Sequence, residues 1–153
     1  MEQNIQPVEP KEVIINHLVK SEDLNHHRTL FAGRSAEWFV ESGFIAVASI
    51  LEPEHVICAQ IHGMKFLKPV KPGNIVCFRS KIVYAGKSSC VTYIKGSVIE
   101  QATHTEAKQV EGFITFVYVS LEGRPIPHNI VVNPLTDEDK ALMEAAKALK
   151  SQR

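Results

Sequence analysis

The chain has 153 residues, of which 44% are hydrophobic and 22% are charged. This length and composition suit one folded domain with a sizeable core and argue against intrinsic disorder. The 17 basic and 17 acidic residues give a formal net charge of +0, which provides no attraction to nucleic acid or to an anionic membrane surface. We therefore expect neither as a partner.

The first segment, residues 1–10, contains two prolines and no hydrophobic periodicity, so we predict a loose arm. Its polar, acidic character is not that of a signal or transit peptide. No apolar run in the chain approaches the length of a membrane-spanning helix. These features lead us to expect a cytoplasmic protein.

The next elements are a strand, a loop and a long helix. Residues 13–19 are apolar and β-branched, which predicts a strand, and residues 21–28 form a polar loop. Residues 31–51 are the longest helical candidate and are apolar on most sides, and Pro53 closes them. A helix of this kind needs to be wrapped by other structure.

Four strand-like runs follow the helix, and turn residues separate them. A polar hairpin tip is predicted over residues 101–108, and short hairpin links imply antiparallel neighbours. Together these elements predict an α+β fold, in which an antiparallel sheet of about five or six strands curls around one long central helix. The runs cover residues 55–66, 74–84, 89–101 and 110–120.

The end of the chain, residues 128–153, is predicted to be an extension with an amphipathic helix. Thr136 can cap this helix, and the acidic residues that follow it favour the positive N-terminal end. Its apolar stripe is expected to pack on the protein itself or on a neighbouring subunit. The stripe consists of Leu142, Met143, Ala146 and Leu149.

The three cysteines, Cys58, Cys77 and Cys90, are far apart and form no CxxC pair. They support neither a zinc site nor a redox motif, and each is expected to be a small buried hydrophobic residue. No spacing of His, Cys and Asp supports a bound metal.

Four segments resemble one known family. "NHHRTLFAG", residues 25–33, is followed after six residues by "VESG", residues 40–43. This resembles the N-x-x-G-x-x-F-G-G motif, six residues and an acid, of the hotdog-fold acyl-CoA thioester hydrolases. "HGMKFLKPVKPGNIVC", residues 62–77, resembles the F-x-x-P-V-x-x-G-D segment of the same family. The turn "AGKSS", residues 85–89, and "LEGRPIP", residues 121–127, complete a resemblance that covers residues 11–127.

The resemblance implies a hotdog domain over residues 11–127 that hydrolyses acyl-CoA thioesters to a free acid and CoA. It implies no cofactor other than the coenzyme A of the substrate. It also implies a homodimer as the minimal unit, with active sites where two sheets join edge to edge, and further assembly to a trimer of dimers.

Two catalytic elements are implied at the start of the long helix and in the loop before it. The backbone N–H groups of Ala32 and Gly33 lie where a helix presents unpaired donors that stabilise an oxyanion. Asn25 matches the catalytic asparagine of the family. Two structural alternatives remain open: a small residue that permits close helix packing, and an asparagine that only satisfies its own turn.

The catalytic acid departs from the family pattern. Val40 occupies the acid position, and the next residue is Glu41, which points about 100° away on a helix. Glu41 is the candidate base or nucleophile. Alternatively, Glu37 or Glu41 only forms an ion pair with Arg34 on the same helix face.

Val40 also keeps a second function open, that of an acyl-CoA-binding or regulatory protein that does not hydrolyse its ligand. A hydratase on the same fold is less well supported, because the chain lacks the His-Phe-Pro type segment and the paired acid. Arg28 replaces a family glycine, and it would bind a phosphate, pair with Glu41 or point to solvent.

The coenzyme is expected at two further places. The resemblance puts Lys87, Ser88 and Ser89 near the phosphates or pantetheine of CoA, a role that hydroxyls and a lysine suit chemically. An ordinary hairpin turn is the alternative. Arg124 is a weaker candidate for the same function.

Overall fold

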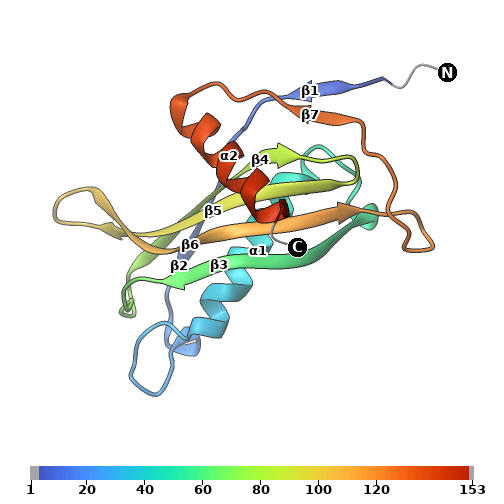
Figure 1. Ribbon diagram of the computed structural model, residues 1–153. Helices are drawn as coiled ribbons and strands as arrows, with labels where there is room; N and C mark the ends of the chain where they lie inside the picture. Colours follow the sequence, from blue (N-terminus) through green and yellow to red (C-terminus); the bar gives the residue numbers. More distant parts are fainter. Residues whose placement is uncertain (1–3, 152–153) are drawn as a thin grey trace.

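A five-stranded antiparallel sheet forms the centre of the computed structural model, which describes residues 4–151 (Figure 1). The strand order across the sheet is β2-β4-β5-β6-β3. The predicted sheet is therefore confirmed. Its strands are β2 (Val13–Leu18), β3 (Val56–Phe66), β4 (Ile75–Ala85), β5 (Ser89–Glu100) and β6 (Thr105–Tyr118).

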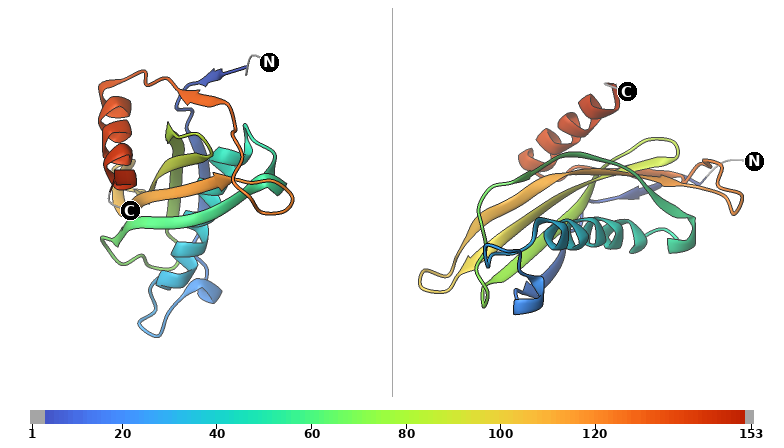
Figure 2. Two further views of the ribbon diagram at one scale, coloured as in Figure 1. Left: turned by 45° about the vertical axis from the view of Figure 1, so that its right-hand side comes forward. Right: turned by 90° about the horizontal axis from the view of Figure 1, so that it is seen from below.

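Two α-helices lie on opposite faces of the sheet (Figure 2, right). Helix α1 (Ala32–Ala48) is the predicted long helix, and α2 (Asp137–Ser151) is the predicted C-terminal one. Two short 3₁₀ turns flank α1 in the sequence, η1 (Ser21–Asp23) and η2 (Pro53–His55). The fold therefore has three layers, with the sheet in the middle.

Helix α1 buries one face only. Its buried residues recur every three or four positions, as expected for a helix that packs on a sheet. The opposite face, which includes Glu37 and Glu41, is exposed. The sequence is apolar on most sides of α1, but within residues 4–151 the sheet covers only one stripe of the helix. The buried stripe is Ser35, Trp38, Phe39, Ser42, Gly43, Ala46 and Val47.

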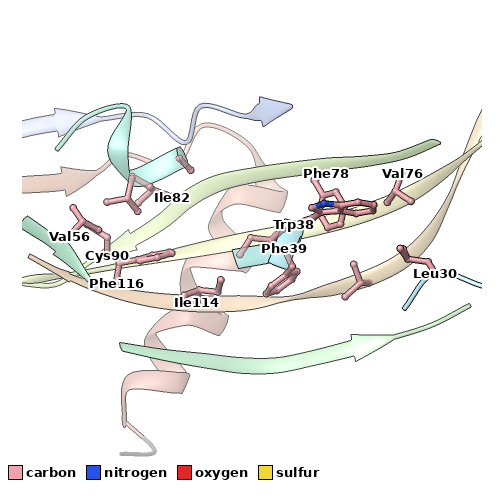
Figure 3. Packing of buried hydrophobic residues seen from close by; sticks show 14 of the residues in the cluster. Leu30, Trp38, Phe39, Val56, Val76, Phe78, Ile82, Cys90, Ile114 and Phe116 are labelled. Carbon is pink, nitrogen blue, oxygen red and sulfur yellow. The ribbon is translucent and has the colours of Figure 1, made fainter. Parts of the chain in front are cut away.

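A small residue lets α1 approach the sheet closely. A Cβ atom at Gly43 would lie 3.1 Å from both Thr92 Oγ1 and Ile94 Cδ1, tighter than ordinary packing contacts. Around this approach, Trp38 packs edge-on against Phe78, with 6.3 Å between ring centroids (Figure 3). The hydrophobic burial of this layer fixes α1 on the sheet.

The N-terminal arm is partly ordered. Strand β1 (Gln6–Val8) pairs in parallel with β7 (Ile130–Val132), and the two form a separate ribbon. The predicted loose arm is therefore wrong for Gln6–Val8. A strand of three residues is too short to show an alternating pattern in the sequence. In addition, β1 and β7 lie more than a hundred residues apart in the chain.

Two further predictions need correction. Strand β6 begins at Thr105, which pairs with Glu100, so the hairpin tip is only residues 101–104. The polar residues of early β6 lie along the ladder, where Glu106 forms an ion pair with Arg79. Cys77 and Cys90 are buried as predicted, but Cys58 is exposed because β3 is an edge strand.

Asp139 anchors α2 to the sheet. Its carboxylate accepts a hydrogen bond from Lys81 Nζ on β4 at 2.7 Å and bonds from the N–H groups of Leu135 and Thr136. The Thr136 hydroxyl in turn accepts from the Asp139 N–H at 3.0 Å, so the predicted cap is confirmed. Burial raises the pKa of Asp139, but the bonds from Lys81 and the backbone outweigh it, and the pKa is lowered.

We predict that Asp139→Asn lowers the free energy of unfolding by about 3 kcal/mol at pH 7, because the largely buried charge of Lys81 loses its close partner and keeps only the exposed Glu138 at 3.9 Å. A group with a lowered pKa stabilises the fold above its unfolded pKa, so the deficit should shrink as the pH falls below about 4. Urea unfolding at several pH values measures this.

Glu138→Gln is the matched control, because Glu138 also faces Lys81, at 3.9 Å, but its side chain is 69% exposed. Its loss should stay below about 0.5 kcal/mol. Equal losses for the two variants would contradict the anchoring role of Asp139.

Candidate functional site

The loop before α1 is organised by Asn25. Its side-chain oxygen accepts hydrogen bonds from the N–H groups of His27 at 2.8 Å and Thr29 at 3.1 Å. Its side-chain nitrogen donates to Thr29 Oγ1 at 3.1 Å. An asparagine side chain carries two N–H bonds, so one remains for another acceptor. The Asn25 side chain therefore forms hydrogen bonds within its own loop, as the structural alternative expected, and one of its N–H bonds remains for another acceptor.

The first turn of α1 presents unpaired donors. Phe31 precedes the helix without a side-chain cap, and among residues 4–151 the N–H groups of Ala32 and Gly33 have no hydrogen-bond partner in the chain. A Cβ atom at Gly33 would lie 2.5 Å from Cε1 of Phe31, so the Phe31 ring covers this turn. Helix N–H groups of this kind attract a negative charge or a polarised carbonyl.

Two pockets meet at this turn. One, of about 330 Å³, is lined by Asn25 and Ala32 together with the end of β3. The other, of about 630 Å³, lies between α1 and β3, and Gly33 and Glu41 line it. The structure thus places Asn25 and Ala32 in one pocket at the start of α1, and Gly33 and Glu41 in a second pocket that extends along the helix. The remaining lining of the larger pocket is Ala36, Glu37, Val40, Phe44, Cys58 and Phe116.

Glu41 is exposed and has no hydrogen bond or ion pair within the described part of the chain. Arg34 instead pairs with Asp23 at 3.3 Å and with Glu37 at 3.1 Å. The ion-pair alternative therefore holds for Glu37 and is wrong for Glu41. Val40 and Glu41 both line the larger pocket, so the change of direction between neighbours does not remove Glu41 from it.

His17 is a neighbour of this site that the sequence did not single out. Its ring stacks on Trp38 at 4.3 Å between centroids, nearly parallel. Burial lowers the pKa of His17, while the negative charges of Glu41 and Asp23 act in the opposite direction. The sequence of β2 did not identify His17 as a neighbour of the site, because the strand pattern alone does not show which residue faces α1.

In the candidate coenzyme turn between β4 and β5, backbone carbonyls accept hydrogen bonds from backbone N–H groups. The Ser88 carbonyl accepts from the N–H of Tyr118 at 2.7 Å, and the Ser89 carbonyl accepts from that of Gly86 at 2.9 Å. Lys87 is exposed and lines a pocket of about 240 Å³ beside the β1–β7 ribbon. Arg124 is exposed in the next turn, where its N–H donates to the hydroxyl of Ser120.

A single chain keeps the Asn25 loop and the candidate coenzyme turn apart. Gln109 lines the pocket of Asn25, whereas Val117 pairs with Ser89. These two β6 residues are eight positions apart, or about 27 Å along a strand. The loop before α1 and the β4–β5 turn accordingly lie at opposite ends of the sheet (Figure 2, right).

Within residues 4–151, no group of three or more His, Cys, Asp or Glu side chains could hold a metal ion. No helix in that range has the length and apolar character required to cross a membrane.

Comparisons with known proteins agree on one family. Residues 27–102 match the family model of the Thioesterase superfamily. An uncharacterized acyl-CoA thioester hydrolase of Bacillus subtilis is 30% identical over 133 residues, which cover 86% of this chain and 75% of the relative. The structure of an acyl-CoA hydrolase from Bacillus cereus matches with a TM-score of 0.85 at 26% identity, over 93% of this chain and 85% of that chain.

A solved apo-hexameric acyl-CoA thioesterase matches with a TM-score of 0.84 at 27% identity, over 97% of this chain and 95% of that chain. Agreement over nearly the whole length confirms the predicted hotdog fold.

Arg28 has a left-handed backbone, with φ of 62°, and forms no ion pair with Glu41 or any other described residue. This conformation costs a non-glycine residue about 1 kcal/mol.

We predict that Arg28→Gly raises the free energy of unfolding by about 0.5–1 kcal/mol in urea titrations. His27→Gly, in the same loop but without a positive φ, should lower it by a similar amount. Destabilisation by Arg28→Gly would show that the arginine side chain has a structural role.

Proposed function

Because the chain belongs to the acyl-CoA thioester hydrolases of the thioesterase superfamily, we propose that it hydrolyses acyl-CoA thioesters to a free carboxylic acid and CoA. One observation carries the proposal for this particular chain. The N–H groups at the start of α1 adjoin a pocket that also contains Glu41, and among the described residues neither those N–H groups nor this carboxylate has a partner.

The reaction needs three contributions that these residues provide. The Ala32 and Gly33 N–H groups bind the thioester oxygen and stabilise the negative charge that develops on it. Glu41 takes a proton from a water molecule that attacks the carbonyl carbon. The remaining N–H of Asn25 orients the water or the carbonyl. The C–S bond then breaks, and CoA leaves as the thiol after it accepts a proton.

The alternative is an acyl-CoA-binding protein without hydrolytic activity. Val40 at the family acid position favours this alternative. The free carboxylate of Glu41 in the same pocket argues against it. Hydrolysis is therefore the function that the geometry supports best.

We propose a homodimer as the smallest active unit. The edge strand β3 leaves its outer hydrogen-bonding side open and exposes Ile57 by 49%, Ile61 by 40% and Phe66 by 44%. A two-fold axis through paired β3 strands would run them antiparallel. The Phe66 end of one chain would then lie beside the Val56 end of the other.

This pairing would bring the two separated halves of the site together, because the Val56 end of β3 lies at the same end of the sheet as Ser89. The catalytic group of one chain would face the coenzyme turn of its partner. The hexameric state of the similar thioesterase supports further association of such dimers.

We predict that Glu41→Gln lowers kcat for acyl-CoA hydrolysis by about 10²–10⁴-fold, because the base is lost, while acyl-CoA still binds. Release of the CoA thiol from acetyl- to palmitoyl-CoA and equilibrium binding measure the two effects. Glu37→Gln is the matched control, since Glu37 lines the same pocket but pairs with Arg34, and it should retain activity. A fully active Glu41→Gln enzyme would eliminate Glu41 as the base.

We predict that Ile61→Lys on β3 at least halves the mass of the assembly and abolishes hydrolysis, because a charge on an edge strand opposes pairing with a second strand. Sedimentation and the thiol assay measure this. Ile14→Lys is the control on the opposite edge strand, β2, where Ile14 is 51% exposed, and it should leave the β3 pairing and the activity intact. An unchanged mass for Ile61→Lys would refute pairing through β3.

A further inference from the structure

His128 links the candidate coenzyme turn to the β1–β7 ribbon. The residue follows the hotdog domain in sequence and is buried, with 8% of its surface exposed. Its own N–H donates to the Lys87 carbonyl at 3.2 Å. Its ring Nε2 lies 2.9 Å from the Ser89 carbonyl, and its Nδ1 lies 2.9 Å from the N–H of Ile130.

These distances define the protonation of the ring. The Ile130 N–H is a donor, so Nδ1 accepts and carries no proton. Nε2 of the neutral ring therefore carries the proton and donates to the Ser89 carbonyl. The ring bridges the start of β5 and the start of β7.

The turn is consequently fixed from one side. Three successive carbonyls, those of Lys87, Ser88 and Ser89, accept hydrogen bonds from His128 and Tyr118. The Lys87 side chain remains exposed beside the pocket of about 240 Å³, which His128 and the ribbon also line. A turn with its carbonyls restrained presents its lysine and hydroxyls in one arrangement, which lowers the ordering cost of binding a ligand.

We propose that His128 is a positioning residue that holds the Lys87–Ser89 turn in the conformation that binds the phosphate-bearing nucleotide end of CoA. The inference rests on the proposed function. It assigns His128 no contact with the reacting thioester.

The test compares two thioesters of the same acyl group, one of CoA and one of N-acetylcysteamine, which lacks the nucleotide and its phosphates. His128→Ala should raise KM for the acyl-CoA about tenfold, as expected for the loss of about 1.4 kcal/mol, and leave kcat within about twofold. Hydrolysis of the N-acetylcysteamine thioester should not change. His128→Gln, whose amide N–H can replace Nε2, should restore most of the affinity, whereas His128→Asn is too short to reach Ser89 and should resemble His128→Ala.

A binding measurement keeps the proposal testable when the small thioester is a poor substrate. Adenosine 3′,5′-bisphosphate carries the nucleotide of CoA without pantetheine or acyl group, and calorimetry should show a weaker Kd for His128→Ala by the same factor. His62→Gln is the control, because His62 is equally buried, at 8%, and contacts Thr115 rather than the turn. Its Kd should equal that of the wild type.

The outcomes separate the two proposals. Wild-type protein that hydrolyses no thioester refutes the proposed function. Wild-type protein that hydrolyses acyl-CoA, with a His128→Ala variant that binds the bisphosphate normally or loses both thioesters equally, overturns the positioning role of His128 alone.

Discussion

The limited reach of one sheet over one helix determines the rest of this structure. Gly43 lets α1 pack closely against Thr92 and Ile94, and the sheet then covers the buried stripe of the helix. The opposite face has no cover among residues 4–151. It forms one wall of the large pocket beside β3 and carries Glu41 there without an ion pair. The helix that organises the core therefore also exposes the candidate catalytic carboxylate.

A second consequence is the division of the candidate site. The helix start, with its unpaired N–H groups, and the β4–β5 turn lie about 27 Å apart along β6. Pairing through the open edge of β3 would join them, since a two-fold axis places the Phe66 end of one β3 strand beside the Val56 end of the other. In our proposal the terminal ribbon also has a functional role, because His128 connects it to the candidate coenzyme turn.

Sequence reasoning located α1 and the five strands of the sheet, because helical periodicity and turn residues are local signals. It also located Thr136 as a cap, since capping needs only neighbouring residues. It missed what depends on strand order or on distant partners. The exposure of Cys58 follows from the edge position of β3, and the contact of His128 with Ser89 joins positions 39 residues apart. The roles of Asn25 and Glu41 stay predictions.

Complementation between two inactive chains tests the shared site most directly. One chain carries Glu41→Gln, and the other carries Lys87→Glu and Ser88→Glu, which repel the phosphates of CoA. After unfolding and refolding together in equal amounts, half of the dimers are mixed, and one of the two sites in each combines an intact α1 with an intact turn. The account predicts recovery of about a quarter of wild-type hydrolysis. No recovery, with mixed dimers present, would show that each site is built from a single chain.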